Sequence, residues 1–187
     1  MRHRFIDLLE QSPVIPAVKA EATLPCALAC ESRVLFLLGG DLLTIRRWIS
    51  MVHEAGKLAV VHIDLVGGLA PKEVAVDWLQ QQGADGIIST RPHLIRRGRE
   101  LGMLTVLRVF AIDSKAVSNL GKEAGMGMPD LIEVLPGTIY KVIARLSREL
   151  PVPLIAGGLL ADKADVTAAL SAGARCVSAS DPELWDL

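Results

Sequence analysis

Short apolar runs recur along the chain and alternate with segments in which apolar residues repeat at helical spacing. The runs are rich in Val, Ile and Leu, as expected of strands that are buried on both faces of a parallel sheet. Most segments between them predict amphipathic helices, and residues 42–55 are an example, with Gly56 as the stop signal. The predicted strands span residues 14–18, 34–38, 58–65, 86–90, 104–112, 131–135, 152–156 and 176–180.

This alternation favours an α/β fold with parallel strands. Eight strands are the number that closes a compact TIM-like (β/α)8 barrel, so we predict a single domain over residues 1–187. The chain is short for that fold, which implies brief loops and one or two stunted helices; an open, doubly wound sheet is the alternative. Residues 126–129 are predicted to be the most mobile loop. The predicted helices are 24–30, 42–55, 72–82, 94–101, 114–124, 140–150 and 162–172.

Composition narrows the class of protein. Hydrophobic residues make up 51% of the chain and the mean hydropathy is +0.39. No apolar run reaches the roughly 18 residues that a membrane-spanning helix needs. Residues 1–10 carry charges throughout and lack the apolar centre of a secretory signal, so we expect a cytoplasmic protein with no membrane partner. A net charge of −1 provides no general positive field for a nucleic acid.

Cysteines and histidines give little support for a metal centre. Cys26 and Cys30 supply only two of the four ligands of a structural zinc, so these two and Cys176 are predicted to be buried, reduced thiols. His62 and Asp64 alternate on a predicted strand and would point to one face, as a metal site or a general acid–base pair would require. No third ligand is evident, and a histidine that lines a pocket without chemistry is the simpler interpretation. We therefore expect no metal and no cofactor.

The glycine pair Gly157-Gly158 follows the seventh predicted strand and precedes a helix. Glycine lets the backbone turn tightly or approach a ligand closely. Asp162 and Asp165 are spaced as an N-cap and its partner three residues later. A glycine turn before a helix start can present free N–H groups to an anion, so we interpret this segment as a phosphate site. A tight strand-to-helix connection without a ligand is the alternative.

Charged residues collect at the predicted carboxyl ends of the strands, where the sites of (β/α)8 barrels lie. Charges so close to buried strands are costly unless they are paired or bind a ligand. Cations suit phosphate and carboxylates accept from hydroxyls, which fits a small phosphorylated polyol; a mutually satisfied ring of salt bridges is the alternative. The candidates are Lys19, Asp64, Arg91, Arg108 and Glu133, together with Gly137, Gly157, Gly158, Ser178 and Ser180.

A second positive cluster surrounds the predicted helix 94–101. Arg96, Arg97 and Arg99, with Arg91 and His93 before them, are candidates for contacts with RNA phosphates. A solvated helix face is the alternative. Aromatic residues are only 4% of the chain, so no stacking platform for bases is evident.

Several motifs occur together in an order that resembles one family, the glycerol-3-phosphate-responsive antiterminators, also called glycerol uptake operon antiterminator regulatory proteins. Single motifs such as Ala-Gly-Gly occur in many barrels, whereas the full ordered set is specific. The resemblance covers residues 14–187. The motifs are IPAVK at 15–19, HIDL at 62–65, GIISTR at 86–91, RVF at 108–110 with Asp113, IEVLPG at 132–137, IAGGL at 155–159 and LWD at 184–186.

The resemblance implies a bacterial TIM-barrel regulator that binds glycerol 3-phosphate and then binds the leader of a glycerol-catabolic messenger RNA, preventing premature transcription termination. It implies no catalysis, and leaves a homo-oligomer open. Asp181 departs from a family pattern that ends in Asn, so we expect its carboxylate to point away from the phosphate or the site to be altered at this end. Residues 125–128 have no family counterpart. The pocket residues carried over by motif are Lys19, Asp64, Arg91, Arg108, Glu133, Gly157, Gly158 and Ser180.

Two other functions stay open. An enzyme acting on a phosphorylated three-carbon compound would use Asp64 or Glu133 as a base and Arg108 as an electrostatic stabiliser. No lysine ends the sixth predicted strand to form a Schiff base, which weakens this alternative. A phosphate-binding scaffold that signals through a protein partner is the third reading.

Overall fold

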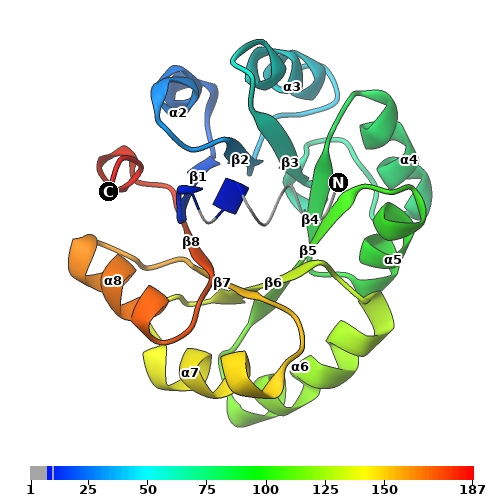
Figure 1. Cartoon of the computed structure of the whole chain (residues 1–187). Helices are drawn as coiled ribbons and strands as arrows, with labels where there is room; N and C mark the ends of the chain where they lie inside the picture. The colour runs from blue at the N-terminus through cyan, green and yellow to red at the C-terminus, as the bar shows by residue number, and fades with distance from the viewer. Residues whose placement is uncertain (1–7, 10) are drawn as a thin grey trace.

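Eight parallel strands close into a barrel in the computed structural model, which describes residues 8–9 and 11–187 (Figure 1). Each strand pairs with the next along the chain, and the last pairs with the first, with Ile15 beside Ser178. This closure confirms the predicted barrel over an open sheet. The strands are β1 Val14–Val18, β2 Val34–Leu37, β3 Leu58–His62, β4 Gly86–Ser89, β5 Leu104–Phe110, β6 Leu131–Leu135, β7 Leu154–Gly157 and β8 Cys176–Ala179.

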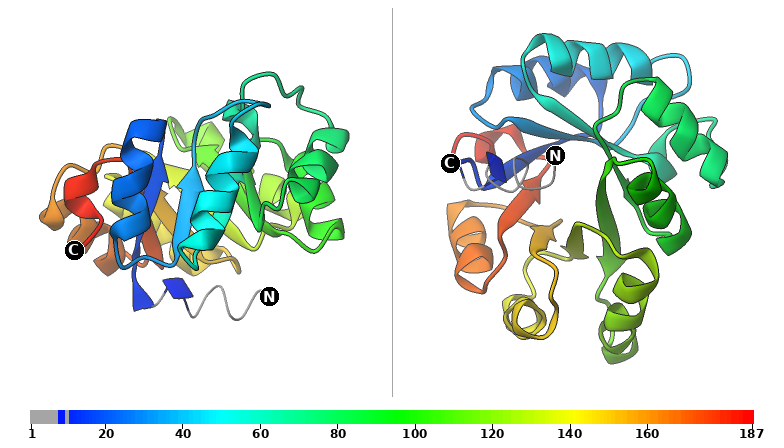
Figure 2. Two further views of the ribbon diagram at one scale, coloured as in Figure 1. Left: turned by 90° about the horizontal axis from the view of Figure 1, so that it is seen from above. Right: turned by 45° about the vertical axis from the view of Figure 1, so that its right-hand side comes forward.

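Helices surround the barrel and cover the outer faces of its strands (Figures 1 and 2). Two of the connections are stunted, as the short chain requires: α2 has six residues, and β8 is followed by a single 3-10 turn. No helix of the described residues is long and apolar enough to cross a membrane. The elements are η1 Glu21–Thr23, α2 Leu24–Ala29, α3 Ile45–Glu54, η2 Ile63–Leu65, α4 Glu73–Gln81, α5 Pro92–Glu100, α6 Ser114–Gly127, α7 Tyr140–Glu149, α8 Lys163–Ser171 and η3 Pro182–Leu184.

Side chains from alternate strands fill the barrel interior in layers of four, as the strand registers dictate. A middle layer is wholly apolar. Toward the carboxyl ends of the strands the layers become polar, and this change of polarity positions the site described below. In that direction the layers are Ile15, Val60, Val106 and Ile155, then Phe36, Ile88, Glu133 and Ser178, then Ala17, His62, Arg108 and Gly157.

The predicted third strand, 58–65, is too long. β3 ends at His62, and residues 63–65 form the 3-10 turn η2. Asp64 therefore leaves the strand, and the prediction that it alternates with His62 on one strand face is wrong. The continuous apolar run concealed this end, because hydropathy does not distinguish a strand from the tight turn that follows it.

Other predicted boundaries also differ from the structure by one to three residues, and two of these differences have a clear local cause. The predicted helix 42–55 begins only at Ile45, because the Asp41 carboxylate accepts from the N–H groups of Leu43 and Thr44, both at 2.9 Å, and forms a turn there. The predicted mobile loop 126–129 is wrong for its first half, because α6 continues to Gly127. Met128 then has a left-handed φ of 48°, which ends the helix.

Candidate functional site

A cavity of about 110 Å³ opens at the carboxyl ends of the strands, inside the mouth of the barrel. The inward residue of β1 at this level is Ala17, whose small side chain lines the cavity and leaves the upper interior unfilled. Polar groups and apolar side chains share its wall. The lining residues are Ala17, Lys19, Leu38, Arg108, Glu133, Leu135, Gly158, Leu159, Leu160, Ser178, Ala179 and Ser180.

Glu133 is the buried centre of the cavity. Its side chain is 1% exposed, and its Oε2 accepts a hydrogen bond from Nε of Arg108 at 2.6 Å. Its Oε1 accepts from the hydroxyl of Ser178 at 2.5 Å. The pairing of β5 with β6 sets Arg108 directly beside Glu133. A carboxylate removed from water is costly unless it is paired and hydrogen-bonded, and here both oxygens have donors.

Glu133, Arg108 and Ser178 form a hydrogen-bonded set that we call the Glu133 group. Gly157 is glycine because this group lies against its backbone. A Cβ at this position would lie 2.6 Å from Oγ of Ser178 and 2.7 Å from Oε1 of Glu133, closer than such atoms approach. The requirement comes from this close approach. Gly157 was predicted to allow close approach of a ligand. In the structure it allows close approach of the Glu133 carboxylate, which in turn binds Arg108.

The cavity has an excess of positive charge. Arg108 is 9% exposed and uses only Nε on Glu133, so its terminal nitrogens have no acceptor among the described residues. Nζ of Lys19 donates to the hydroxyl of Ser180 at 3.0 Å. Two cations and one carboxylate leave one net positive charge at the cavity wall, which favours an anion.

The loop between β7 and α8 lines the cavity through Gly158, Leu159 and Leu160. Gly158 and Leu159 are both left-handed, with φ of 74° and 59°. The N–H groups of Gly158, Leu159 and Leu160 have no acceptor within the described part of the chain. Consecutive free N–H groups beside two cations form an anion-binding arrangement.

The start of α8 itself is already occupied. The carboxylate of Asp162 accepts from the N–H of Asp165 at 2.9 Å, which confirms the predicted N-cap. Asp165 in turn accepts from the N–H of Ala161 at 2.8 Å. The N–H groups of residues 158–160, which line the cavity and have no acceptor among the described residues, therefore belong to the loop before this capped helix.

Of the residues predicted for the site, most meet at this cavity. Gly137 supports it from the next loop, where its N–H donates to the carbonyl of Gly158 at 2.9 Å. Asp181 does not line the cavity, since its carboxylate accepts from the N–H of Glu183 at 3.0 Å and caps η3. The predicted residues that line the cavity or its floor are Lys19, Arg108, Glu133, Gly157, Gly158, Ser178 and Ser180.

Asp64 and Arg91 lie outside the cavity lining and form a separate network. The Asp64 carboxylate accepts from the Ser89 hydroxyl at 3.0 Å and from the N–H of Thr90 at 2.7 Å. Nε of Arg91 lies 3.7 Å from Oδ1 of the same carboxylate. These contacts attach η2 to the beginning of α5, so Asp64 supports the rim of the barrel.

His62 lies in the same interior layer as Arg108 and is 2% exposed. Burial, and then the positive charge of Arg108, lower the pKa of His62 from 6.5 to about 4, so the imidazole is neutral at pH 7. Its Nδ1 is buried without a hydrogen-bond partner among the described residues. No group of three or more His, Cys, Asp or Glu side chains in the described ranges is arranged to hold a metal ion.

Cysteine burial differs in part from the prediction. All three thiols are free, and Cys30 and Cys176 are buried, but Cys26 is exposed on α2. The helix buries Leu24 and Ala27, so a residue two positions after Leu24 faces outward.

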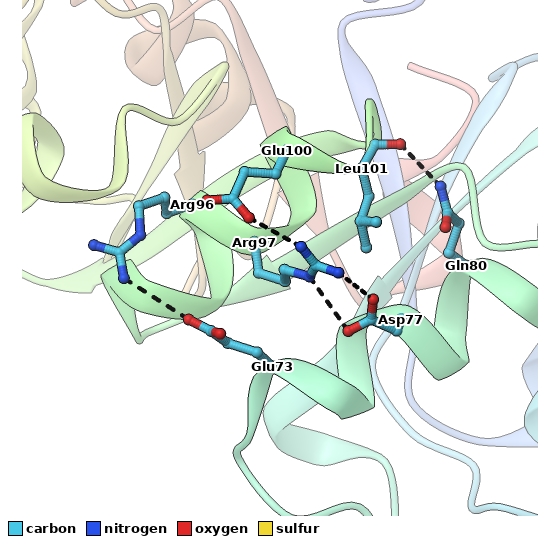
Figure 3. Close-up of polar contacts among 7 residues, drawn as sticks. All are labelled: Glu73, Asp77, Gln80, Arg96, Arg97, Glu100 and Leu101. Atoms are coloured by element: carbon cyan, nitrogen blue, oxygen red, sulfur yellow. Dashed lines mark hydrogen bonds and ion pairs between the residues drawn. The ribbon is translucent and has the colours of Figure 1, made fainter.

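Ion pairs engage the arginine predicted to be at the centre of the RNA cluster (Figure 3). On α5, Arg97 donates to both carboxylate oxygens of Asp77 on α4, at 2.5 and 3.3 Å. It also donates to Glu100 at 3.0 Å. Hydrogen bonds to these carboxylates raise the pKa of Arg97. Arg97 therefore joins α4 to α5.

The other two arginines of the cluster are less constrained. The terminal nitrogen of Arg96 lies 3.7 Å from the carboxylate of Glu73, and its side chain is 59% exposed (Figure 3). Arg99 donates to the carbonyl of Met128 at the end of α6. These two side chains lie on the outer surface of the barrel, away from the cavity lining.

Apolar lining residues were missed in the sequence. Leu38 and Leu135 follow inward-facing Phe36 and Glu133 by two positions, so strand alternation was a sufficient signal for both. Leu159 gave no signal, because nothing in its residue type indicates a left-handed backbone.

Comparisons with known proteins agree with this fold and point to one family. A family model described as glycerol-3-phosphate responsive antiterminator matches residues 14–185. The chain is 37% identical over 184 residues to YgcP of Escherichia coli K12, covering 98% of this chain and 96% of that protein. Two crystal structures, each 31% identical, also match. The glycerol uptake operon antiterminator regulatory protein of Listeria monocytogenes 4b F2365 matches with a TM-score of 0.88, covering 92% of this chain and 94% of that one. A glycerol uptake operon antiterminator-related protein of Thermotoga maritima MSB8 matches with a TM-score of 0.84, covering 93% of this chain and 98% of that one.

Replacing Gly157 with Ala should disrupt the Glu133 group. The new methyl group must displace Ser178 or Glu133, at a cost of roughly 1–3 kcal/mol in the free energy of unfolding. Urea denaturation measures this cost. Gly125→Ala in α6 is the matched control, since nothing lies within 4 Å of its Cβ position; it should be neutral or stabilising by up to about 1 kcal/mol. Equal stabilities for the two variants would contradict the packing described for Gly157.

Acid should destabilise the protein through His62. Because the folded pKa is about 4 and the ordinary one 6.5, the unfolded chain binds the proton more tightly. Stability is therefore complete above pH 6.5 and falls toward pH 4, by roughly 3 kcal/mol. Urea denaturation at pH 7 and pH 4.5 should show this loss in the wild type and a smaller one in both His62→Gln and His62→Leu. An unchanged loss in both variants would assign the acid sensitivity to other groups.

Proposed function

Because the chain belongs to the glycerol-3-phosphate responsive antiterminator family, we propose that it binds glycerol 3-phosphate in the barrel-mouth cavity and, with this ligand bound, binds the leader of a glycerol-gene messenger RNA and prevents termination. The observation that carries the proposal is Arg108, a buried cation whose terminal nitrogens have no acceptor among the described residues and which lines a small cavity.

The phosphate group fits the side of the cavity that has the most donors. Lys19, Arg108 and Ser180 line the cavity together with residues 158–160, whose N–H groups have no acceptor among the described residues. A phosphate monoester carries about −1.5 to −2 charges at pH 7, which the excess positive charge at the wall partly neutralises. Hydrogen bonds from the two cations to the phosphate would be charge-assisted, and such bonds are stronger than those between neutral groups.

The glycerol hydroxyls fit the floor of the same cavity. Glu133 and Ser178 both line it, and a carboxylate accepts hydrogen bonds from hydroxyl groups. The apolar wall from Leu135 and Leu160 suits the carbon chain. One end of the ligand is thus matched by cations and N–H groups, and the other by acceptors.

The geometry supports binding better than catalysis. Both oxygens of Glu133 accept hydrogen bonds from protein donors, so this carboxylate is held as a structural acceptor. Asp64, the other base that an enzyme would use, does not line the cavity and accepts from Ser89 and Thr90. A regulator needs only that the ligand bind the RNA-competent state more tightly than the other state.

For the RNA contact, Arg96 and Arg99 are the better candidates of the α5 cluster. Arg97 is committed to Asp77 and Glu100, whereas the Arg96 side chain is 59% exposed. With a net charge of −1, the protein must rely on such local contacts for affinity toward RNA phosphates.

Replacing Lys19 with Met should weaken glycerol 3-phosphate binding by about tenfold to a hundredfold, the effect of one lost charge-assisted hydrogen bond. Calorimetric titration measures the change. Lys141→Met is the control, since this exposed lysine lies on α7 outside the cavity. Glycerol without its phosphate should bind neither protein measurably. Equal affinities of Lys19→Met and the wild type for glycerol 3-phosphate would remove Lys19 from the ligand site.

Substituting Arg96 and Arg99 together by Ala should reduce the salt dependence of leader-RNA binding. Each lost phosphate contact lowers the slope of log affinity against log salt by about 0.7 for a single strand. Filter binding at several salt concentrations, with saturating glycerol 3-phosphate, gives the slope. The matched control is Arg145→Ala with Arg148→Ala on α7, which removes the same charge elsewhere. If both double variants keep the wild-type slope, α5 does not contact the RNA.

A further inference from the structure

We infer that Tyr140 and Asp165 are positioning residues that hold the loop of residues 158–161 in its anion-binding conformation. The inference rests on the proposed function, in that the anion is taken to be the phosphate of glycerol 3-phosphate. Neither residue lines the cavity, so both would act through the loop backbone.

Asp165 connects the loop to a neighbouring helix. Its Oδ2 accepts from the N–H of Ala161 at 2.8 Å, directly after the three free N–H groups. Its Oδ1 accepts from the hydroxyl of Tyr140 at 2.7 Å. Tyr140 begins α7 and Asp165 is in the first turn of α8, and these helices are adjacent on the outside of the barrel (Figure 1).

The loop needs such support because its backbone is strained. A left-handed conformation costs a non-glycine residue roughly 1–2 kcal/mol, and Leu159 adopts one. Its side chain is 76% exposed, so packing of that side chain does not account for the conformation. Strained residues persist where surrounding contacts determine them, and such residues occur at ligand sites.

Both ends of the loop are held by the connection that follows β6. At the start, the N–H of Gly137 donates to the carbonyl of Gly158 at 2.9 Å. A Cβ on Gly137 would lie 3.1 Å from the nitrogen of Gly157 and 3.1 Å from Cδ2 of Leu160, which shows how closely the two connections pack. At the end, Tyr140 reaches Ala161 through Asp165. One segment, residues 137–140, thus contacts both ends of the loop and restrains its backbone.

Capping of α8 alone does not explain this arrangement. Asp162 already accepts from the N–H of Asp165 and serves as the N-cap of the helix. The Tyr140 hydroxyl adds nothing to the helix; it fixes the rotamer of the carboxylate that binds Ala161. Supporting groups of this kind hold a binding geometry that the contacting groups cannot hold alone.

Tyr140→Phe is the decisive variant, because it removes one hydroxyl and leaves the ring and every charge in place. It should weaken binding of glycerol 3-phosphate by about threefold to tenfold, the effect of one ordinary hydrogen bond. Calorimetric titration measures this. In an Asp165→Ala background, adding Tyr140→Phe should change the affinity less than twofold, since the hydroxyl then has no carboxylate to orient. A merely structural role would give additive losses in the two variants.

Tyr140 is the only tyrosine of the chain, which provides a spectroscopic readout. With tyrosine labelled by carbon-13, its single ring signal should shift on addition of glycerol 3-phosphate and saturate at the concentration where calorimetry does. Asp113→Asn is the control: it removes a charge from a helix start, where Asp113 accepts from the N–H of Ala116 at 2.7 Å, and should leave both affinity and ring signal unchanged.

Inorganic phosphate serves as a second probe and separates the two proposals. If the wild type binds phosphate but not glycerol 3-phosphate, the proposed function fails, and Tyr140→Phe must weaken phosphate binding threefold or more for the loop inference to hold. The inference would be overturned if Tyr140→Phe bound the anion with wild-type affinity. It would also be overturned if the Tyr140 ring signal did not shift when a ligand binds. Binding of neither anion by the wild type would overturn both proposals.

Discussion

The barrel mouth depends on one buried ion pair. The desolvation cost of a carboxylate in the barrel interior is offset only when hydrogen-bond donors contact its oxygens. Glu133 accepts from Arg108 on one oxygen and from Ser178 on the other. Those donors come from β5 and β8, on either side of β6 and its neighbour β7. Gly157 of β7 lies between them and must lack a side chain, because the carboxylate and the hydroxyl already occupy the space.

The same pair lines a cavity in what would otherwise be a core layer. Deeper layers are closed by Val60, Val106 and Ile155, which pack as an ordinary apolar interior. Once Glu133 holds Nε of Arg108, the rest of the guanidinium lies at the cavity wall. Breaking the pair from the Arg108 side would leave an unpaired buried charge. The residues that stabilise the barrel mouth are therefore the ones that we propose to bind the anion.

Strand alternation explains why much of the fold and site could be predicted from the sequence. Period-two patterning places Arg108, Glu133 and Ser178 on inward positions near strand ends, and parallel closure brings such positions together. Asp64 was misplaced because a 3-10 turn and a strand look alike in an apolar run. The pairs Arg97–Asp77 and Tyr140–Asp165 join residues on different helices, and only the packing of those helices brings them into contact.

Pairing of surface charges has a consequence for the proposed RNA contact. Arg97 is paired with Asp77 and Glu100, and the net charge is −1, so the chain has no net positive charge that would hold RNA by general attraction. An antiterminator that responds to a metabolite must be inactive without it, and strong non-specific attraction to phosphates would defeat that response. In the proposed function, weak general electrostatics, with affinity left to a few contacts such as Arg96 and Arg99, would let the ligand determine when RNA is bound. This requires that glycerol 3-phosphate bind the RNA-competent state much more tightly than the other state.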